Sequence, residues 1–486
     1  MSIVTISPAT RLEGEAEIRI ILDEKGNVKD AYFQIIEFRG FEKFCVGRPA
    51  EELPRIVTRI CGVCPWAHHM ASSKATDMLY GREPPSAAKK LRELGYCAHI
   101  LDSHSIHFFA LALPDFALSP RAPRRERSII GLYKKNPELV KKVLRMREKI
   151  TRVEEIIGGK AIHPVTSIPG GLSKPITEEE RKEIEENAKE LLKFSMESVE
   201  LFSKLVEKNE NKDLVFGDYY ILKTHYAGLV DKNNKVNFYD GMIRVVSVDG
   251  KELFKFEAKD YLEYIAEKVT PWSYTKMPYL KKIGWRGIVD GPDSGIYRVG
   301  PLGRINAADG FATDKAQEYY ERFVELFGKP AHHTMAFHYA RVIEMVYASE
   351  RMLELVQDEE ITSKDVLNIE GEITGCGIAA VEAPRGLLIH HYESDENGIT
   401  TMANFIIPTT MNNPSINLDI KRVSARLIEN GKYDDGILNM IEMAFRAYDP
   451  CLACSTHSIP GALKIIVKIY SSDGKLIRKL GGEYYG

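Results

Sequence analysis

Apolar and polar residues alternate along the first forty positions of the chain. The alternation runs through EAEIRIIL, pauses at the turn-forming stretch DEKGN, and resumes in VKDAYFQIIEF. A period of two is typical of β-strands with one buried face. The N-terminal segment is therefore predicted to form antiparallel sheet.

The next part of the chain shows the spacing of amphipathic helices instead. Apolar residues recur every three to four positions over residues 87–116 and again over residues 128–157, which predicts long helices. Thr177 and Glu180 form a capping box that begins another long helix. The apolar face of that helix comprises Ile184, Leu191, Leu192, Met196, Val199 and Phe202.

The second half of the chain mixes both patterns. Residues 213–282 are rich in strand and turn signals, whereas residues 315–327 and 332–357 are helical in pattern. Glycine and proline in residues 371–386 and 406–414 indicate strand or loop. We expect one large α+β domain, predominantly helical, in which a core of long helices carries antiparallel sheet at its periphery.

Charge and hydropathy exclude several classes of function. The 486-residue chain has 66 Lys and Arg against 69 Asp and Glu, so nothing indicates binding to nucleic acid or to an anionic membrane. Its longest apolar stretch, IHFFALALPDFAL, is interrupted by His107, Pro114 and Asp115 and is too short to span a bilayer. No secretory signal opens the sequence, so a cytoplasmic location is expected.

Cysteine spacing supplies the candidate chemistry. Four of the seven cysteines fall in two Cys-x-x-Cys pairs, RICGVCPWAH near the start and DPCLACSTH near the end. Cys45, Cys97 and Cys376 stand alone and are interpreted as ordinary buried thiols. Spacing alone leaves three alternatives open for the pairs, namely a catalytic metal, a structural zinc ion and an iron–sulfur cluster. A catalytic metal is favoured because the pairs are too far apart in sequence to form a local zinc ribbon.

Together the two motifs resemble the signatures of the large subunit of nickel-iron hydrogenases. Further stretches resemble the same family: TRLEGEAEI, EFRGFEKF, HSIHFF, IHPVTSIPGG, YRVGPLGRIN, VEAPRGLL and PTTMNNP. Among its branches the chain is most similar to the methyl-viologen-reducing, coenzyme F-420 non-reducing enzymes of archaea. The resemblance implies the large-subunit fold of that family and the reversible oxidation of dihydrogen to protons and electrons.

The resemblance also implies a set of metal ligands. Cys61, Cys64, Cys451 and Cys454 match the nickel ligands, and Cys64 and Cys454 would bridge to an iron that carries carbonyl and cyanide. A second site would hold magnesium or another divalent ion. Its ligands would be the side chains of Glu42 and His457 and the backbone carbonyl of Phe405.

Other residues match the family's catalytic and supporting positions. Cys451 would act as the base, Glu13 would relay the proton outward, and Arg385 would lie over the open metal position. Asp449 is expected to pair with Arg385, and His68 to donate a hydrogen bond to a ligand sulfur. Pro408 and Thr409 match positions that contact a cyanide.

One position departs from the family pattern. Many relatives have aspartate where this chain has Ser103, and Asp102 lies one residue too early. The complete acidic surrounding of Arg385 is therefore in doubt. The remaining histidines are interpreted as packed helix residues rather than ligands, and these are His104, His107, His332, His333, His390 and His391.

The resemblance divides the chain into a hydrogenase domain, residues 1–457, and a C-terminal extension, residues 458–486, that a maturation endopeptidase would remove. Three scattered cysteines cannot build an electron relay, so an iron–sulfur small subunit is the expected partner. An electron-transfer adaptor and a heterodisulfide reductase are expected beyond it. The alternative is a non-catalytic scaffold with structural zinc, related to the quinone-binding subunit of respiratory complex I.

Overall fold

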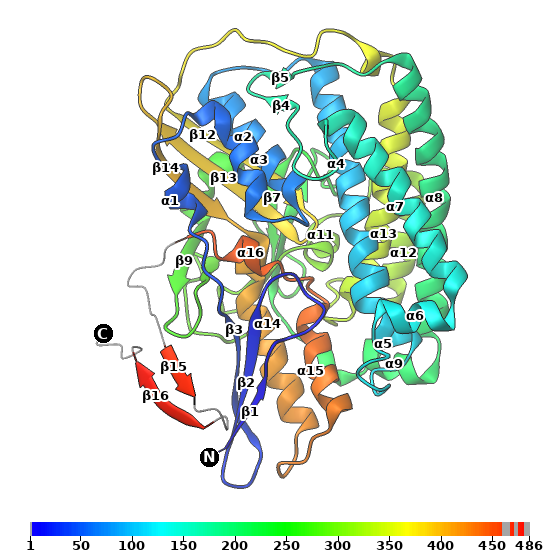
Figure 1. Ribbon diagram of the computed structural model, residues 1–486, viewed down its shortest axis with the longest axis vertical. Coiled ribbons are helices and arrows are strands. Elements are labelled where there is room, and N and C mark those ends of the chain that lie inside the picture. Colours follow the sequence, from blue (N-terminus) through cyan, green and yellow to red (C-terminus); the bar gives the residue numbers. More distant parts are fainter. Residues whose placement is uncertain (1, 459–466, 471–474, 481–486) are drawn as a thin grey trace.

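A computed structural model of the chain describes residues 2–458, 467–470 and 475–480. Several of its long helices stand side by side along one flank of the molecule, and small sheets occupy the other flank and one end (Figure 1). The longer helices are α3 (Pro65–Leu79), α4 (Ser86–Ile106), α7 (Pro137–Gly158), α8 (Glu178–Val206), α12 (Asp314–Phe327), α13 (Ala336–Val356), α14 (Pro408–Leu427) and α15 (Asp435–Arg446).

Shorter helices connect these elements. They are α1 (Phe41–Cys45), α2 (Leu53–Ile56), α5 (Leu113–Ala117), α6 (Ile129–Lys135), α9 (Asn209–Phe216), α10 (Tyr261–Tyr264), α11 (Pro301–Ala307) and α16 (Leu452–Ser455). A π-helical turn over His107–Ala112 joins α4 to α5, so the predicted helix over residues 87–116 is nearly continuous. The helix predicted over residues 128–157 is two helices, because Asn136 ends α6 and caps α7.

Helix α13 is the centre of the helical bundle. Nearly every one of its residues is buried, and it packs against α8, α4, α12 and α11. The capping box predicted at α8 is present, since Thr177 accepts from the backbone N–H of Glu180 while the Glu180 carboxylate accepts from Thr177 N–H. Amphipathic α8 thus buries one stripe on the bundle and exposes its charged face to water.

Antiparallel pairing dominates the sheets. The strands are β1 (Ser2–Ile6), β2 (Ala16–Leu22), β3 (Val28–Ile35), β4 (Ser167–Ile168), β5 (Gly171–Leu172), β6 (His225–Val230), β7 (Met242–Val246), β8 (Glu252–Phe256), β9 (Ile265–Val269), β10 (Lys276–Leu280), β11 (Tyr297–Arg298), β12 (Cys376–Ala383), β13 (Gly386–Ser394), β14 (Thr400–Ile406), β15 (Val467–Tyr470) and β16 (Leu476–Leu480). They form three-stranded sheets β1-β2-β3 and β12-β13-β14, a four-stranded sheet β11-β6-β7-β8, and three two-stranded pairs. The expected α+β class is confirmed.

One sequence-based prediction fails close to the site. The stretch PTTMNNP was expected as strand or loop, but it forms the first turns of α14. Pro408 occupies the first helical turn, where a missing N–H costs nothing. The polar side chains that follow are buried and bonded to neighbouring segments, for example Asn412 to the backbone of Val299. Tertiary contacts have overridden the turn signal here.

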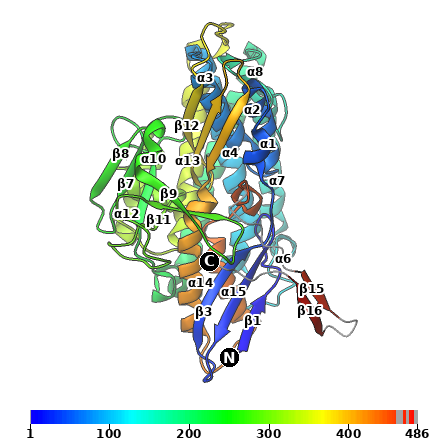
Figure 2. The same cartoon turned by 90° about the vertical axis from the view of Figure 1, so that its left-hand side faces the viewer.

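The segments that carry the two Cys-x-x-Cys motifs approach each other. In Figure 1, helix α16 lies below the first-motif segment at α2–α3 and directly above α14, with which it is in contact. The β15–β16 hairpin stands away from the rest of the described chain in both views (Figures 1 and 2). Its predicted turn, SSDG, lies outside the described residues. Among the residues described, no helix is both long and apolar enough to cross a membrane.

Candidate metal centre

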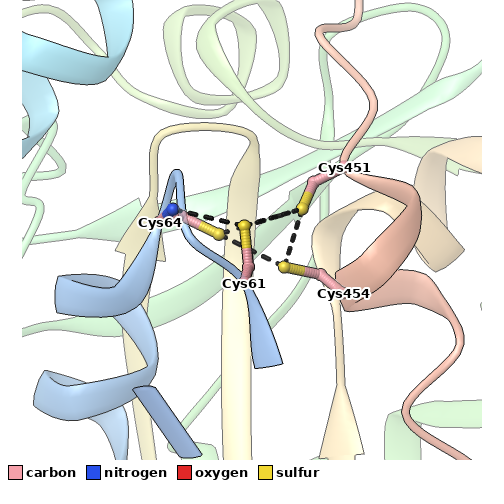
Figure 3. A group of neighbouring side chains, drawn as sticks. All are labelled: Cys61, Cys64, Cys451 and Cys454. Carbon is pink, nitrogen blue, oxygen red and sulfur yellow. Dashed lines mark hydrogen bonds between the residues drawn. The ribbon is translucent and has the colours of Figure 1, made fainter. Parts of the chain in front are cut away.

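Four cysteine sulfurs from opposite ends of the sequence form one buried cluster (Figure 3). Cys61 lies in the loop before α3 and Cys64 caps that helix, whereas Cys451 caps α16 and Cys454 lies within it. All four Sγ atoms lie within 4.8 Å of one another. The sulfur of Cys451 is 3.3 Å from that of Cys61 and 2.8 Å from that of Cys454.

The local backbone favours an anionic sulfur in this cluster. The N–H groups of Val63 and Cys64 point at Cys61 Sγ from 3.1 and 3.4 Å. Hydrogen bonds from the thiols, that of Cys451 foremost, hold the pKa of Cys61 well below its usual range. Burial raises the pKa of Cys451 and of Cys454 instead. A metal ion would replace the protons that the four sulfurs share.

The donor set fits a thiophilic metal ion. A tetrahedral ion bound at about 2.3 Å by four thiolates holds its sulfurs roughly 3.7 Å apart. The sulfur of Cys64 is 3.2 Å from that of Cys454 and 4.0 Å from that of Cys451, which brackets this value. A small cavity of about 10 Å³ borders the cluster, and its lining includes Cys64, Arg385, Pro408, Thr409, Cys451 and Cys454.

Glu13 reaches the cluster from the N-terminal segment. Its backbone is bridged to that of Cys451, and its carbonyl accepts from Leu452 N–H at 3.0 Å. The Glu13 Oε2 atom accepts from Cys451 Sγ at 3.0 Å and from Ala453 N–H at 3.1 Å. Burial, with a smaller contribution from Cys61, raises the pKa of the Glu13 carboxyl. A proton can therefore pass between Cys451 Sγ and a carboxyl in direct contact.

Arg385 lines the cavity from the turn between β12 and β13. Its Nε donates to the Asp449 carbonyl at 2.7 Å, and its Nη2 to Asp449 Oδ1 at 3.2 Å. Its Nη1 is buried and has no hydrogen-bond partner within the described parts of the chain. Asp449 has φ 55, a left-handed conformation that Asp adopts more readily than most residues. The pairing expected between Arg385 and Asp449 is present.

Pro408 and Thr409 line the same cavity from the start of α14. The Thr409 hydroxyl accepts from the backbone N–H of Cys451 at 3.0 Å, which fixes the start of α16. This contact uses the helical turn that the sequence did not predict.

His68 contacts the cluster, and behind it lies a chain of buried polar groups. His68 Nε2 is 3.4 Å from Cys454 Sγ, and its Nδ1 is 3.1 Å from His390 Nε2. His390 Nδ1 is 2.8 Å from the Tyr392 hydroxyl, which donates to Ser72 Oγ. Burial lowers the pKa of His68 to about 4, so this ring is neutral. Both His390 and His391 lie on strand β13, so their interpretation as residues of a packed helix was wrong.

The residues expected at a divalent ion form a second cluster next to the first. Glu42 Oε1 is 3.4 Å from His457 Nε2 and accepts from Phe405 N–H at 2.9 Å, and His457 also bonds to the Phe405 backbone. Lys276, which the sequence did not indicate, places its ammonium 3.4 Å from Glu42 Oε1. The same ammonium is 2.9 Å from Glu267 Oε2. A carboxylate, an imidazole and a carbonyl suit a divalent ion, and Lys276 supplies the positive charge beside them.

The remaining candidates are accounted for by ordinary contacts. Cys45 and Cys97 are buried as expected, but Cys376 is exposed because it begins strand β12. Asp102 pairs with Arg147 at 2.8 Å, and Ser103 Oγ is buried without a partner among described residues. The histidines interpreted as packing residues bond to neighbouring groups: His104 to Glu344, His107 to the Arg446 carbonyl, and His332 to the Tyr226 hydroxyl. His333 packs against Phe327, and neither His332 nor His333 is helical as expected, because α13 begins only at Ala336.

Comparison with known proteins agrees with this geometry. The family model described as nickel-dependent hydrogenase matches residues 39–121 and 140–457. One component of an F-420-non-reducing hydrogenase from Archaeoglobus profundus is 49% identical over 484 residues, with 99% of each chain covered. The beta subunit of an NAD-reducing hydrogenase from Cupriavidus necator is 35% identical, with 98% of each chain covered. A crystal structure of an NAD-reducing NiFe hydrogenase superposes with TM-score 0.89 at 36% identity, covering 94% of this chain and all of that one.

The fold and the four-thiol site define a hydrogenase large subunit. The chain belongs to the nickel-dependent hydrogenase family, as the family model and relatives of nearly equal length show. Its class of reaction is that of an oxidoreductase acting on dihydrogen, and its similarity to the archaeal F-420-non-reducing branch is confirmed. Of the two functions expected from the sequence, these matches favour the enzyme over the zinc scaffold.

Proposed function

We propose that the four thiolates hold a nickel–iron centre, with carbonyl and cyanide on the iron, and that dihydrogen is split heterolytically beside them. When bound, that centre supplies the Lewis acid that takes the electron pair of dihydrogen. The chain supplies the base and the way out for the proton. The observation that carries this proposal is the contact of Cys451 Sγ with Glu13 Oε2 at 3.0 Å inside a buried thiol cluster.

Cys451 is the better base of the two groups that face the cavity. Its sulfur contacts a carboxyl that can accept the proton, and Glu13 is partly open toward the surface. Arg385 is already committed to Asp449 through two of its nitrogens, and a guanidinium gives up a proton very reluctantly. We therefore assign Arg385 the task of fixing charge and polar groups in the cavity through its free Nη1.

The electrons need a partner protein. The three cysteines outside the cluster are distributed over α1, α4 and β12 and make no cluster with one another. An iron–sulfur small subunit would take the electrons, as the naming of the relatives as components of multi-subunit enzymes supports. An electron-transfer adaptor and a heterodisulfide reductase in the cytoplasm would complete the route in an F-420-non-reducing system.

Glu42, His457 and the Phe405 carbonyl are proposed to hold magnesium or another divalent ion. The His457 Nε2 atom is buried and lies 3.4 Å from Glu42 Oε1, so an imidazole nitrogen and a carboxylate oxygen converge where an ion could bind both. Its Nδ1 is 2.9 Å from the Cys454 carbonyl, so the ring ties this second cluster to the thiol cluster. An ion here would fix the C-terminal end of residues 1–457, and residues 458–486 would be removed by a maturation endopeptidase.

The decisive experiment replaces one sulfur. Cys451→Ala should abolish dihydrogen-dependent dye reduction and the infrared bands of carbonyl and cyanide in the purified enzyme, because both a ligand and the base are lost. Cys376→Ala is the matched control, since that cysteine is exposed and outside the cluster. Zinc in the wild-type chain without infrared bands would instead establish the structural alternative. Full activity in Cys451→Ala would exclude its assigned role.

A further inference from the structure

Arg304, in the stretch YRVGPLGRIN, lies in a buried network that the proposed reaction does not use. It belongs to α11 and has no exposed surface. All five of its N–H donors find an acceptor. Nε and Nη2 each bond a Glu344 oxygen at 2.6 Å, and Nη1 bonds Glu382 Oε2 at 2.6 Å. The two remaining donors reach backbone carbonyls.

Those carbonyls belong to the residues immediately before Arg385. Arg304 Nη1 donates to the Ala383 carbonyl at 3.0 Å and Nη2 to the Pro384 carbonyl at 3.2 Å. Arg385 follows at the turn between β12 and β13, where its guanidinium enters the cavity beside the thiols. The planar guanidinium of Arg304 therefore holds the two peptide groups that precede Arg385 and set the position of its backbone.

Close packing restricts the same turn from its other side. A methyl group on Gly300 would approach the carbonyl oxygen of Arg385 to 2.7 Å, and Gly300 has φ 88. The backbone on both sides of Arg385 is thus in direct contact with the α11 segment. A shift of α11 would move the turn as well.

Helix α13 connects this support to the partner of Arg385. Glu344 on α13 holds Arg304, and Arg341, one turn earlier on the same helix, donates to the Ala447 carbonyl at 3.0 Å. Ala447 lies two residues before Asp449, the residue that Arg385 binds. One rigid helix thus sets the position of both the Arg385 turn and the Asp449 segment.

We propose that Arg304 is a positioning residue that fixes the Arg385 guanidinium above the thiol cluster through the carbonyls of Ala383 and Pro384. This inference rests on the role proposed for Arg385. An ion pair buried only for stability needs no contact with two consecutive carbonyls, and such pairs are often replaceable by apolar residues. Lysine could keep the charge of Arg304 but could not bond both carboxylates and both carbonyls at once.

The test uses Arg304→Lys and Arg385→Lys, alone and together, in the purified holoenzyme with its copurifying subunits. Displacement of a catalytic-site group by about 1 Å can cost on the order of 100-fold in rate. We expect Arg304→Lys to lower kcat by about 10- to 100-fold and to shift the infrared bands of the iron ligands. In the Arg385→Lys background the same change should lower kcat less than about twofold, because Arg304 acts through Arg385.

Arg92→Lys is the matched control. Arg92 is equally buried but lies on α4, where it bonds Asp77 and the carbonyls of Ile168 and Gly171 and makes no hydrogen bond to residues 383–385. It should lower the unfolding midpoint without shifting the infrared bands. Glu344→Gln is a milder second variant, because it keeps Arg304 and weakens only the bonds from its Nε and Nη2 to the Glu344 carboxylate. We therefore expect a smaller shift of the same infrared bands.

Two results would overturn the proposal. One is unshifted infrared bands in folded, metal-replete Arg304→Lys or, if that variant does not accumulate, in Glu344→Gln. The other is a loss of kcat that is fully multiplicative in the double variant. If Arg385→Lys alone keeps wild-type kcat, the role proposed for Arg385 fails instead. The infrared bands of the Arg304 variant still report whether the turn has moved.

Discussion

The contact between Glu13 and Cys451 joins two residues that are 438 positions apart. Burial raises the pKa of the carboxyl, and the backbone N–H of Ala453 keeps its Oε2 atom directed at the sulfur. A carboxyl whose pKa is raised holds a proton at a higher pH than an exposed one. These properties suit the proposed role of Glu13, which is to receive a proton from sulfur and release it toward water.

Glu13→Gln should leave the metals bound and block the proton path. The amide keeps the size of the side chain and can still accept from Ala453 N–H, but it cannot accept and release a proton. We expect exchange between deuterium gas and water to fall by about 10²- to 10⁴-fold, the usual contribution of a positioned acid–base group. Mass spectrometry of the evolved gas measures the exchange.

The control for this substitution is Glu15→Gln, two residues along on the exposed side of the same segment. It should exchange at the wild-type rate. A Glu13→Gln enzyme that keeps both its nickel content and its exchange rate would exclude Glu13 as the relay.

Sequence alone could identify the residues that carry local motifs, but not the groups behind them. The four cysteines, Glu13 and Arg385 stand in recognisable stretches. The structure gathers the cysteines into one cluster, with Glu13 in contact with Cys451 and Arg385 lining the adjoining cavity. His390 and Lys276 gave no such signal. They lie on strands β13 and β10 and reach the site only through pairing of segments far apart in sequence.

At the scale of elements, Trp66 holds the first motif against the helical bundle. It follows Cys64 by two residues on α3 and is 1% exposed. Two glycines, Gly95 on α4 and Gly158 at the end of α7, leave the space that its ring fills. A methyl group on Gly95 would come within 2.8 Å of the ring, and one on Gly158 within 2.4 Å. The position of α3, and of Cys64 with it, depends on both.

Gly158→Ala should therefore destabilise the chain and weaken its metal site. Overpacking a filled core typically costs about 1–3 kcal/mol. Urea unfolding of the purified chain, followed by tryptophan fluorescence, measures this loss, and nickel content after reconstitution reports the displacement of Cys64. Gly62→Ala is the control in the same motif, because a methyl group there meets no atom within 4 Å. Equal stability of the two variants would contradict this account of the packing.

Element prediction succeeded where periodicity was strong and failed where buried polar groups decided the structure. Helix α8 and the sheet β1-β2-β3 follow directly from pattern and capping. Helix α14 does not, because its first turns contain proline, threonine and asparagine, which usually signal a turn. Those side chains bond to other segments, as Thr409 does to Cys451, and no local pattern encodes such partners.

At the scale of the whole molecule, the site forms only when both ends of the chain are in place. The Thr456 carbonyl accepts from the N–H groups of Arg39 and Gly40, and the His457 carbonyl accepts from Glu42 N–H at 2.9 Å. His457 is therefore seated beside Glu42 while the chain continues into Ser458. Attachment of the extension alone does not keep this histidine from its site.

Processing of the extension should therefore depend on metal loading rather than on access of His457. Ser458 is 1% exposed, so the bond after His457 is buried in this structure. An endopeptidase must act on a state in which this segment is open, and binding of nickel to the cysteines would decide when that state closes.

Mass spectrometry of the purified chain tests this dependence. We predict the mass of residues 1–457 for the chain from nickel-replete cells and the mass of residues 1–486 for the chain from nickel-starved cells. Cys454→Ser should keep the extension even with nickel present, whereas Cys376→Ser should lose it. A mass of residues 1–486 in all four samples would show that residues 458–486 are a permanent part of the protein, and a mass of residues 1–457 in all four would show that processing does not depend on the metal.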